Sequence, residues 1–452
     1  MSVARSLPVI MPSIPNQRWS CHSCGNCCRS LVGHLFESDR RRIDQQGWEH
    51  QLGVAPYVRM GREWVLNKTA DEACVFLDAN GLCKIHAKYG EAAKPFACRI
   101  FPFSVRPVER GWQVSFRFDC PSSTSSLGKP IAQHASWLRE LVAGLQHRPR
   151  SDEDVADLQP RVRATEAEID LIFNRFHRWL TASEPPFAQR LIGAARITNT
   201  LCAAQFTNVR GGRLGELLDL LFTALPAECS QPPQAPTRRQ SGLLRQIAFA
   251  HVEHVSHAEA TSGRWTKFRK RWQQLRRARR FLKGKGRVPR LRGLGPWALP
   301  SSNRAVNSPL ADPPVDPAFE AVEAVTCGRE DDSIAELVLR YLIARLESRA
   351  CFGEGYYGWP IFSGLAALWL GVPAAGWLGR YRAACAGRTS VSFEDVACAV
   401  GVVDRAATRL PALGAPAERI RVAYLARNDG LARLMARYLP ISDDSRSVSL
   451  VP

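Results

Sequence analysis

The stretch CHSCGNCC, residues 21–28, places four thiols within eight positions. A gap of two residues between cysteines lets a tight loop direct successive sulfurs toward one metal centre. Cys27 and Cys28 are adjacent, so their side chains point in different directions from an extended backbone. At most one of this pair completes a first centre, which leaves the other for a second centre or for redox work. The stretch therefore predicts a small, irregular, metal-binding N-terminal domain.

Four more thiols follow within the first 120 residues, at Cys74, Cys83, Cys98 and Cys120. A closed site of soft ligands needs four sulfurs around each centre, so these distant thiols must converge with the first four. Cys120 precedes a proline, as the remote fourth cysteine does in the bacterial ferredoxin-type run. The alternative is a set of disulfides or inert core thiols.

The N-terminus argues against that alternative. Its apolar patch is broken by Pro8, Pro12 and Pro15 and lacks the continuous run of a secretory signal. We therefore expect a cytoplasmic protein, in which thiols stay reduced and a cysteine pattern indicates metal. Six other cysteines are isolated among apolar residues and are expected to be buried small hydrophobes. They are Cys202, Cys229, Cys327, Cys351, Cys385 and Cys398.

The chain has 452 residues, 45% of them hydrophobic and 23% charged, which predicts a globular protein of two or three domains. Its net charge of +19 is concentrated in residues 264–292, which contain fourteen Lys or Arg and no acid. Trp265, Phe268, Trp272, Leu275 and Leu282 fall close to one helical stripe there. This pattern predicts a basic amphipathic helix with an anionic partner: a phosphate backbone, a membrane surface or an acidic protein. The alternative is a helix that docks its stripe on the core.

The predicted fold is mainly α, with a few short strands near the N-terminus. Strand alternation occurs at 62–68 and 111–118, and helical periodicity at 161–182, 188–205, 213–225 and 242–258. Four regions are expected: a cysteine domain at 18–122, a helical region at 130–283, a Pro/Gly-rich linker at 284–318 and a second helical region at 319–440. The uncharged stretch 355–379 is divided by Pro360, Pro373 and six glycines. It favours two buried helices meeting at 371–373 over a membrane span.

The stretch CVFLDANGLCKIHAKYGEAAKPFACRIFPF, residues 74–103, supplies the pattern C-x-F-L, G-x-C-x-I and K-P-x-x-C-R-x-F-P-F. Together with CHSCGNCC it resembles the CxxCxxCC cysteine-cluster family, a zinc- or iron-chelating domain also found in flagellin lysine N-methylases. The resemblance covers about residues 18–122. One departure is the longer gap between His86 and the Lys94-Pro95 pair.

The resemblance implies that all eight N-terminal cysteines are metal ligands and that an iron–sulfur cluster is favoured over zinc. Lys94 and Arg99 are expected to offset thiolate charge, and backbone amides near Gly25 to donate hydrogen bonds to sulfur. His22, His34 and His86 are interpreted as surface or supporting residues rather than ligands. The triad His251, His254 and His257, at three-residue steps, is interpreted as a solvated helix face.

Three functions stay open at this point. The first is a metal or iron–sulfur protein that acts as a protein-lysine N-methylase on a flagellin-like protein substrate. That activity, with its S-adenosylmethionine donor, is implied by the resemblance alone, because no donor-binding motif is present. The second is a non-catalytic, cluster-bearing module that docks on nucleic acid or an acidic partner. The third is a zinc-stapled structural protein.

Overall fold

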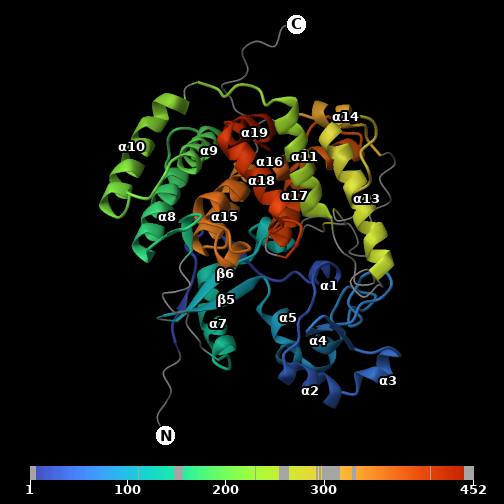
Figure 1. Ribbon diagram of the computed structural model, residues 1–452. Coiled ribbons are helices and arrows are strands. Elements are labelled where there is room, and N and C mark those ends of the chain that lie inside the picture. Colours follow the sequence, from blue (N-terminus) through green and yellow to red (C-terminus); the bar gives the residue numbers. More distant parts are fainter. Residues whose placement is uncertain are drawn as a thin grey trace.

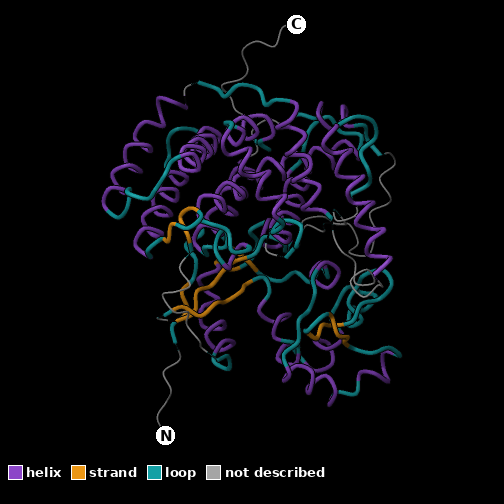
Figure 2. Tube along the Cα trace, in the orientation of Figure 1, coloured by secondary structure: helices purple, strands orange, loops and turns teal. Residues whose placement is uncertain are grey.

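The computed structural model of the protein describes residues 7–109, 111–146, 156–229, 231–253, 264–291, 294, 297, 316–327, 332–407 and 409–441. Figure 1 shows a large helical body and, below it, a smaller lobe built from the N-terminal part of the chain. Strands occur only as short pieces in the described residues, most of them toward the N-terminus (Figure 2). The predicted fold class, mainly α with an irregular cysteine-rich N-terminal part, is confirmed.

The N-terminal lobe, which we call the cysteine lobe (residues 20–100), is made of short elements. They are α1 (Asn26–Ser30), α2 (Glu37–Gln45), α3 (Trp48–Leu52), β3 (Tyr57–Met60), β4 (Glu63–Leu66), α4 (Lys84–Tyr89), a 3-10 turn (Glu91–Ala93) and α5 (Phe96–Ile100). Strands β3 and β4 pair antiparallel, which confirms the strand predicted at 62–68. The lobe has a small apolar core of its own, which includes Trp48 and Phe76. Cys28, Cys83 and Cys98 pack against that core, so the thiols supply part of its wall.

A three-stranded sheet joins the cysteine lobe to the helical body. Its strands are β1 (Val9–Ile10), β5 (Phe103–Val108) and β6 (Gly111–Phe116), in the order β1-β6-β5. Strand β6 confirms the strand predicted at 111–118. Short elements follow: β2 (Arg18–Trp19) pairs with β7 (Lys129–Pro130), and α6 (Pro121–Thr124), a 3-10 turn (Ile131–His134) and α7 (Ala135–Val142) continue the chain. Phe103, Phe116 and Phe118 belong to the large core of the helical body, so this sheet is part of that body.

The helical body contains the remaining elements. They are β8 (Asp157–Gln159), β9 (Val162–Arg163), α8 (Glu166–Thr181), α9 (Phe187–Ala203), α10 (Gly212–Cys229), α11 (Arg238–Val252), α13 (Arg264–Lys283), α14 (Phe319–Ala324), α15 (Asp332–Glu347), a 3-10 turn (Glu354–Tyr356), α16 (Ile361–Cys385), α17 (Phe393–Ala406), α18 (Pro416–Arg427) and α19 (Gly430–Tyr438). The predicted apolar face of α8 is buried, from Ile169 to Leu180. Helix α8 begins at a capping box in which Thr165 and Glu168 exchange hydrogen bonds.

Both ends of the predicted 284–318 linker pack on the body. Val288 donates its backbone N–H to Pro317 O (2.9 Å), and Leu291 and Trp297 are buried. Most of the linker between these ends lies outside the described residues. The division into four regions stays a prediction.

Helix α16 corrects one expectation, because it runs as a single helix through Pro373 instead of as two helices. Glycine allows its close packing: a Cβ on Gly376 would lie 1.8 Å from Tyr438 O, and one on Gly364 would lie 1.9 Å from Cys351 O. Packing on all sides compensates for the hydrogen bond that a proline removes. By length and composition α16 is able to cross a membrane, yet its most apolar 18 residues are 89% buried among the other helices.

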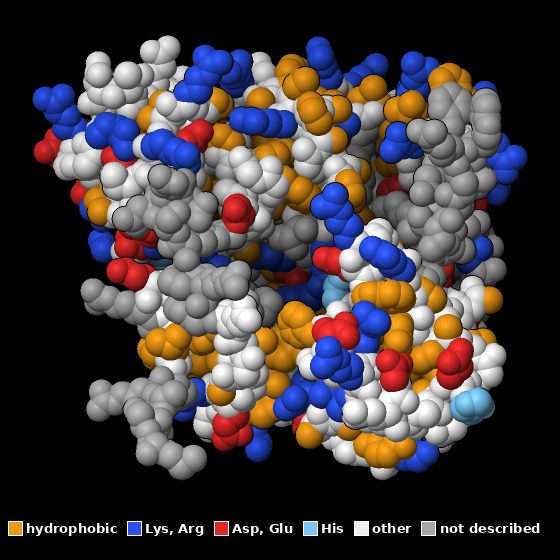
Figure 3. All heavy atoms as spheres, turned by 60° about the horizontal axis from the view of Figure 1, so that its bottom comes forward, with side chains coloured by type: hydrophobic (Ala, Val, Ile, Leu, Met, Phe, Trp, Pro, Cys, Tyr) orange, Lys and Arg blue, Asp and Glu red, His pale blue; other side chains and the backbone are white. Residues whose placement is uncertain are grey.

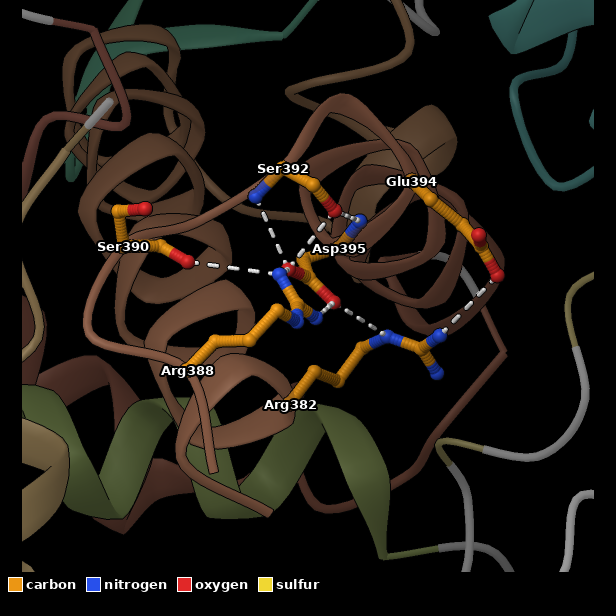
Figure 4. A network of polar contacts seen from close by, with 6 residues as sticks. All are labelled: Arg382, Arg388, Ser390, Ser392, Glu394 and Asp395. Atoms are coloured by element: carbon orange, nitrogen blue, oxygen red, sulfur yellow. Dashed lines mark hydrogen bonds and ion pairs between the residues drawn. The ribbon is translucent and has the colours of Figure 1, made fainter. Parts of the chain in front are cut away.

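A buried carboxylate fixes the turn between α16 and α17 (Figure 4). Asp395 accepts a hydrogen bond from the Ser392 backbone (3.0 Å), and Ser392 Oγ accepts one from the Asp395 backbone, which completes a capping box. Arg388 binds both oxygens of Asp395 (2.7 and 2.8 Å), and Arg382 lies 3.4 Å away. Asp395 is 2% exposed, so its charge depends on these partners.

We predict that Asp395→Asn lowers the free energy of unfolding by about 3 kcal/mol, because it weakens a helix cap and leaves Arg388 without its anion. Urea denaturation measures this loss. The matched control is Glu394→Gln, since the Glu394 side chain is 38% exposed and its carboxylate lies 3.7 Å from Arg382. The control is expected to change the unfolding free energy by less than about 0.5 kcal/mol. Equal losses in the two variants would contradict this account.

Candidate metal centre

The first four thiols lie on a loop that turns directly into a short helix. Gly25 has a φ of 66° and its Cβ position lies 3.2 Å from Gly81 O, so only glycine fits this turn. Helix α1 begins immediately afterwards and carries Cys27 and Cys28. The Asn26 backbone hydrogen-bonds the thiol of Cys24. The expectation that amides near Gly25 serve the sulfurs is therefore confirmed by the described geometry.

The second set of thiols is brought to the same helix by backbone pairing. The Cys74 backbone N–H donates to Cys28 O (2.8 Å). Cys83 pairs with Leu77 in an isolated bridge and immediately precedes α4. Cys98 lies on α5. Three separate segments therefore meet around α1.

A thiol whose charge raises the pKa of another thiol lies close to it, so the pKa shifts identify neighbouring thiols. Burial raises the pKa of Cys24 to about 12; the Asn26 amide opposes the shift, and the thiols of Cys120, Cys27 and Cys21 add to it. This set consists of the loop cysteines and the remote Cys120. Four thiols thus approach one another at the side of the lobe that faces the helical body.

A second set of neighbours surrounds Cys98. Burial raises the pKa of Cys98 far above its usual value, and Cys74, Cys27 and Cys83 raise it further, while Lys94 opposes them. Burial likewise raises the pKa of Cys74 to about 11, with Cys83 and Cys27 adding to the shift. Cys98 reaches its neighbours although the gap before Lys94 is long, because α4 and the 3-10 turn at Glu91–Ala93 absorb the extra residues.

Cys27 lies between the two sets. The pKa of Cys27 is raised chiefly by a hydrogen bond with the Cys28 side chain and next by burial. The charge of Lys94 opposes this rise. Its thiol is a neighbour of members of both sets. Cys27 and Cys28 therefore stand where two groups of four sulfurs meet.

The donor set is suited to a soft metal. All thiols among the described cysteines are free. Within those residues, no three Cys, His, Asp or Glu side chains gather closely enough to enclose a single ion. Thiolates are soft ligands, so this donor set suits zinc or iron.

Cys120 connects the sulfur groups to the helical body. Burial raises its pKa to about 11, and the backbone amides of Ser123 and Ser122 oppose the shift. Two residues earlier, the Phe118 backbone N–H donates to Asp404 Oδ2 on α17 (2.9 Å). Asp404 also pairs with Arg345 of α15 at 2.5 Å, and both side chains are buried. Burial raises the pKa of Asp404, and Arg345 opposes that shift.

Two further contacts tie the same segment to its surroundings. Asp119 is completely buried and pairs with Arg117. Arg340 of α15 donates to Thr124 O (3.0 Å). Sequence reasoning had no signal for the contact between Thr124 and Arg340, because the two residues lie 216 positions apart. Figure 3 shows a recess between the cysteine lobe and the body, with Lys and Arg side chains in it.

Asp39 and Arg42 of α2 position the segment that carries Cys98, and sequence reasoning missed both. Asp39 is 2% exposed and accepts a hydrogen bond from the Phe96 backbone (3.2 Å), at the start of α5. Arg42 donates to Ala93 O and Lys94 O, each at 3.2 Å. The E-S-D-R-R-R run of α2 reads as an ordinary solvated helix face, which hid this role.

The other residues singled out in the sequence have separate places. His22 hydrogen-bonds Ser122, His34 pairs with Glu63 (2.7 Å), and His86 is exposed on α4. The charge of Lys94 opposes the rise in the pKa of Cys27 and of Cys98, as expected, and the role of Arg99 stays a prediction. His251 corrects the idea of a solvated face, because it is buried and bonds Ile247 O (2.8 Å). His254 and His257 lie outside the described residues.

Most of the six isolated cysteines behave as apolar residues. Cys351, Cys385 and Cys398 are buried, as predicted. Cys202 and Cys327 are half-buried and donate to Phe362 O (3.4 Å) and Leu439 O (2.8 Å). The side chain of Cys229 lies outside the described residues.

A groove of about 570 Å³ lies apart from the thiols, between the β5–β6 hairpin, α8 and the residues that follow α15. Its lining carries more acids than bases. The acids are Glu109, Glu166, Asp170, Glu347 and Glu354. Arg349 pairs with Glu166 and Asp170 there, and His177 lies 3.5 Å from Glu347.

Comparison with known proteins agrees with the sulfur chemistry. Residues 20–121 match the CxxCxxCC family, described as "Putative zinc- or iron-chelating domain". The predicted resemblance is therefore confirmed for this part of the chain, which carries all eight N-terminal thiols. An uncharacterized protein of Methanocaldococcus jannaschii is 29% identical over 86 residues, which are 19% of this chain and 29% of that relative. The chain thus matches less than a third of that relative's length. No solved structure matches.

We predict that the metal-free protein loses stability as pH rises above 9. The folded-state pKa values of Cys24, Cys74 and Cys120 are about 12, 11 and 11, against 9.0 for an ordinary thiol. Between pH 9 and 11 the unfolded chain ionises these thiols while the folded chain keeps them protonated. Each thiol then costs about 1.4 kcal/mol of stability by pH 10.

Urea denaturation of the metal-free protein at pH 8, 9 and 10 measures this loss. The double variant Cys24→Ser/Cys120→Ser serves as the control and is expected to show a shallower dependence on pH. A stability that is the same at pH 8 and pH 10 in the parent would contradict the burial of these thiols.

Proposed function

We propose that the cysteine lobe, together with Cys120, holds two iron–sulfur clusters. The first group of ligands is the loop set with the remote cysteine. It consists of Cys21, Cys24, Cys27 and Cys120. The second group consists of Cys28, Cys74, Cys83 and Cys98. Adjacent Cys27 and Cys28 serve different centres, so the two clusters are close neighbours.

One observation carries this proposal: the N-terminal thiols gather where the cysteine lobe meets the segment of Cys120, and Cys27 is a neighbour of both Cys24 and Cys98. Eight cysteines supply four ligands to each of two centres. Sets of four thiolates are the ligands that hold iron–sulfur clusters.

The surroundings of the thiols also suit a cluster. Ionised thiolates need opposing charge, and Lys94 lies near Cys27 and Cys98, while Lys68 lies near Cys74 and Cys28. Backbone amides of Asn26, Phe76 and Ser123 point to the sulfurs of Cys24, Cys74 and Cys120. Such hydrogen bonds tune the reduction potential. When bound, a cluster of this kind supplies one-electron transfer and braces the lobe.

Anaerobic purification tests the metal. The expected result is a brown protein with a broad visible absorption band and with iron and acid-labile sulfide in equal amounts. A colourless protein with stoichiometric zinc and no iron would show that the lobe is a zinc-stapled structure.

The two-group assignment is tested by removing one ligand from each group. We predict that Cys120→Ala and Cys83→Ala each lose about half of the iron, and that the double variant loses nearly all of it. The matched control is Cys385→Ala, a buried thiol of α16 that is expected to keep the full iron content. Loss of all iron in either single variant would instead indicate one shared centre.

Metal binding also contributes to folding of the lobe, whose own apolar core is small. We predict that Cys24→Ala and Cys98→Ala make residues 18–122 sensitive to limited proteolysis, because each removes a sulfur from one group. Cys202→Ala, remote from the lobe, is the control. Proteolysis at the same rate in Cys98→Ala and the parent would remove the downstream segment from the site.

A second candidate function is methyl transfer from S-adenosylmethionine to lysine on a flagellin-like protein. The acidic groove near β5 and β6 favours it, because Glu109, Glu347 and Glu354 attract a cationic side chain. Mass spectrometry of a lysine-bearing protein incubated with the donor tests the activity. Glu109→Gln is expected to raise KM more than it lowers kcat. Without any methyl gain on the substrate, the cluster-bearing module is the better description.

A further inference from the structure

Helix α13 turns apolar side chains outward, away from the helical body. Trp272 is 57% exposed, Leu275 is 60% exposed and Leu282 is 38% exposed. Steps of three and seven residues place them along one side of a helix. The side chains of Trp265 and Phe268 lie outside the described residues. Leu282 lies partly against α11, since its Cδ1 is 3.1 Å from the position of a Cβ on Gly242. Trp272 and Leu275 therefore form the exposed part of the predicted stripe.

The opposite side of α13 is firmly held, so the outward stripe is a fixed feature. Phe281 is completely buried and stacks on Phe249 of α11, with ring centroids 4.7 Å apart. Arg245 Nε donates to Phe281 O (2.9 Å), and Gln246 donates to Ala278 O (3.0 Å). These contacts fix the rotation of the helix about its axis.

Positive charge flanks the exposed stripe on both sides. Arg271, Arg276, Arg279 and Lys283 are all exposed, and residues 264–292 contain no acid. Arg277, on the body side, instead pairs with Glu253 of the body at 3.4 Å. Figure 1 shows α13 at the outer edge of the helical body.

We propose that this outward face of α13 binds an anionic lipid surface, with the helix lying in the plane of the interface. Trp272 and Leu275 enter the region between headgroups and acyl chains, and the flanking arginines contact lipid phosphates. A lipid surface covers the apolar stripe and neutralises the cations at once. A nucleic-acid backbone would satisfy the cations alone and leave Trp272 and Leu275 in water.

Sedimentation of the full-length, metal-loaded protein with vesicles tests the proposal. The expected result is binding to phosphatidylcholine vesicles that contain phosphatidylserine, and little binding to phosphatidylcholine alone. Trp272→Gln/Leu275→Gln is expected to weaken the partition coefficient at least tenfold. Arg276→Gln/Arg279→Gln is expected to weaken it similarly and to flatten its dependence on salt.

Leu220→Gln is the matched control, because Leu220 is 70% exposed on α10 and lies outside the basic segment. It is expected to bind vesicles as the parent does, and all variants to keep the parent's circular dichroism and metal content. Unchanged vesicle binding by Trp272→Gln/Leu275→Gln would overturn the proposal. So would tighter binding of the parent to poly(U) RNA than to the anionic vesicles, lost only in the arginine variant, since the partner would then be a nucleic acid.

Discussion

The buried pair of Asp404 and Arg345 anchors the segment that leads to Cys120 on the helical body. Asp404 is buried, so its charge is stable only with partners, and it finds them on two separate parts of the chain. One is the guanidinium of Arg345 on α15, and the other is the backbone N–H of Phe118. Cys120 lies two residues beyond Phe118. The position of one sulfur is thereby set by a salt bridge deep in the helical body.

The cysteine lobe, by contrast, has only a small apolar core of its own. Its small core is closed on one side by the half-buried Cys28, Cys83 and Cys98. In the metal-free protein these sulfurs pack as part of the apolar core, and in the metal-loaded protein they act as ligands. The same burial that raises the thiol pKa values makes each thiolate costly until a metal neutralises it.

Local patterns were enough to predict much of this structure. Spacing identified the eight thiols, and periodicity located β4, β6 and α8 together with its buried face from Ile169 to Leu180. The same reasoning split α16 at Pro373, because local rules cannot register that neighbours such as Tyr438 hold a helix intact across a proline. The roles of Asp39 and Asp404 could not be predicted for a similar reason. They depend on the distant backbone N–H groups of Phe96 and Phe118, and no local pattern encodes those contacts.

The long separation between Phe118 and Asp404 has a consequence for how the protein is made. They are 286 positions apart, so at about 5–20 residues per second α17 follows β6 from the ribosome on the order of half a minute later. During that interval all eight N-terminal thiols exist while the segment holding Cys120 lacks its contact with Asp404 of α17. During this interval metal binding competes with oxidation of the thiols in the newly made lobe. The interval ends when the C-terminal helices have been synthesised.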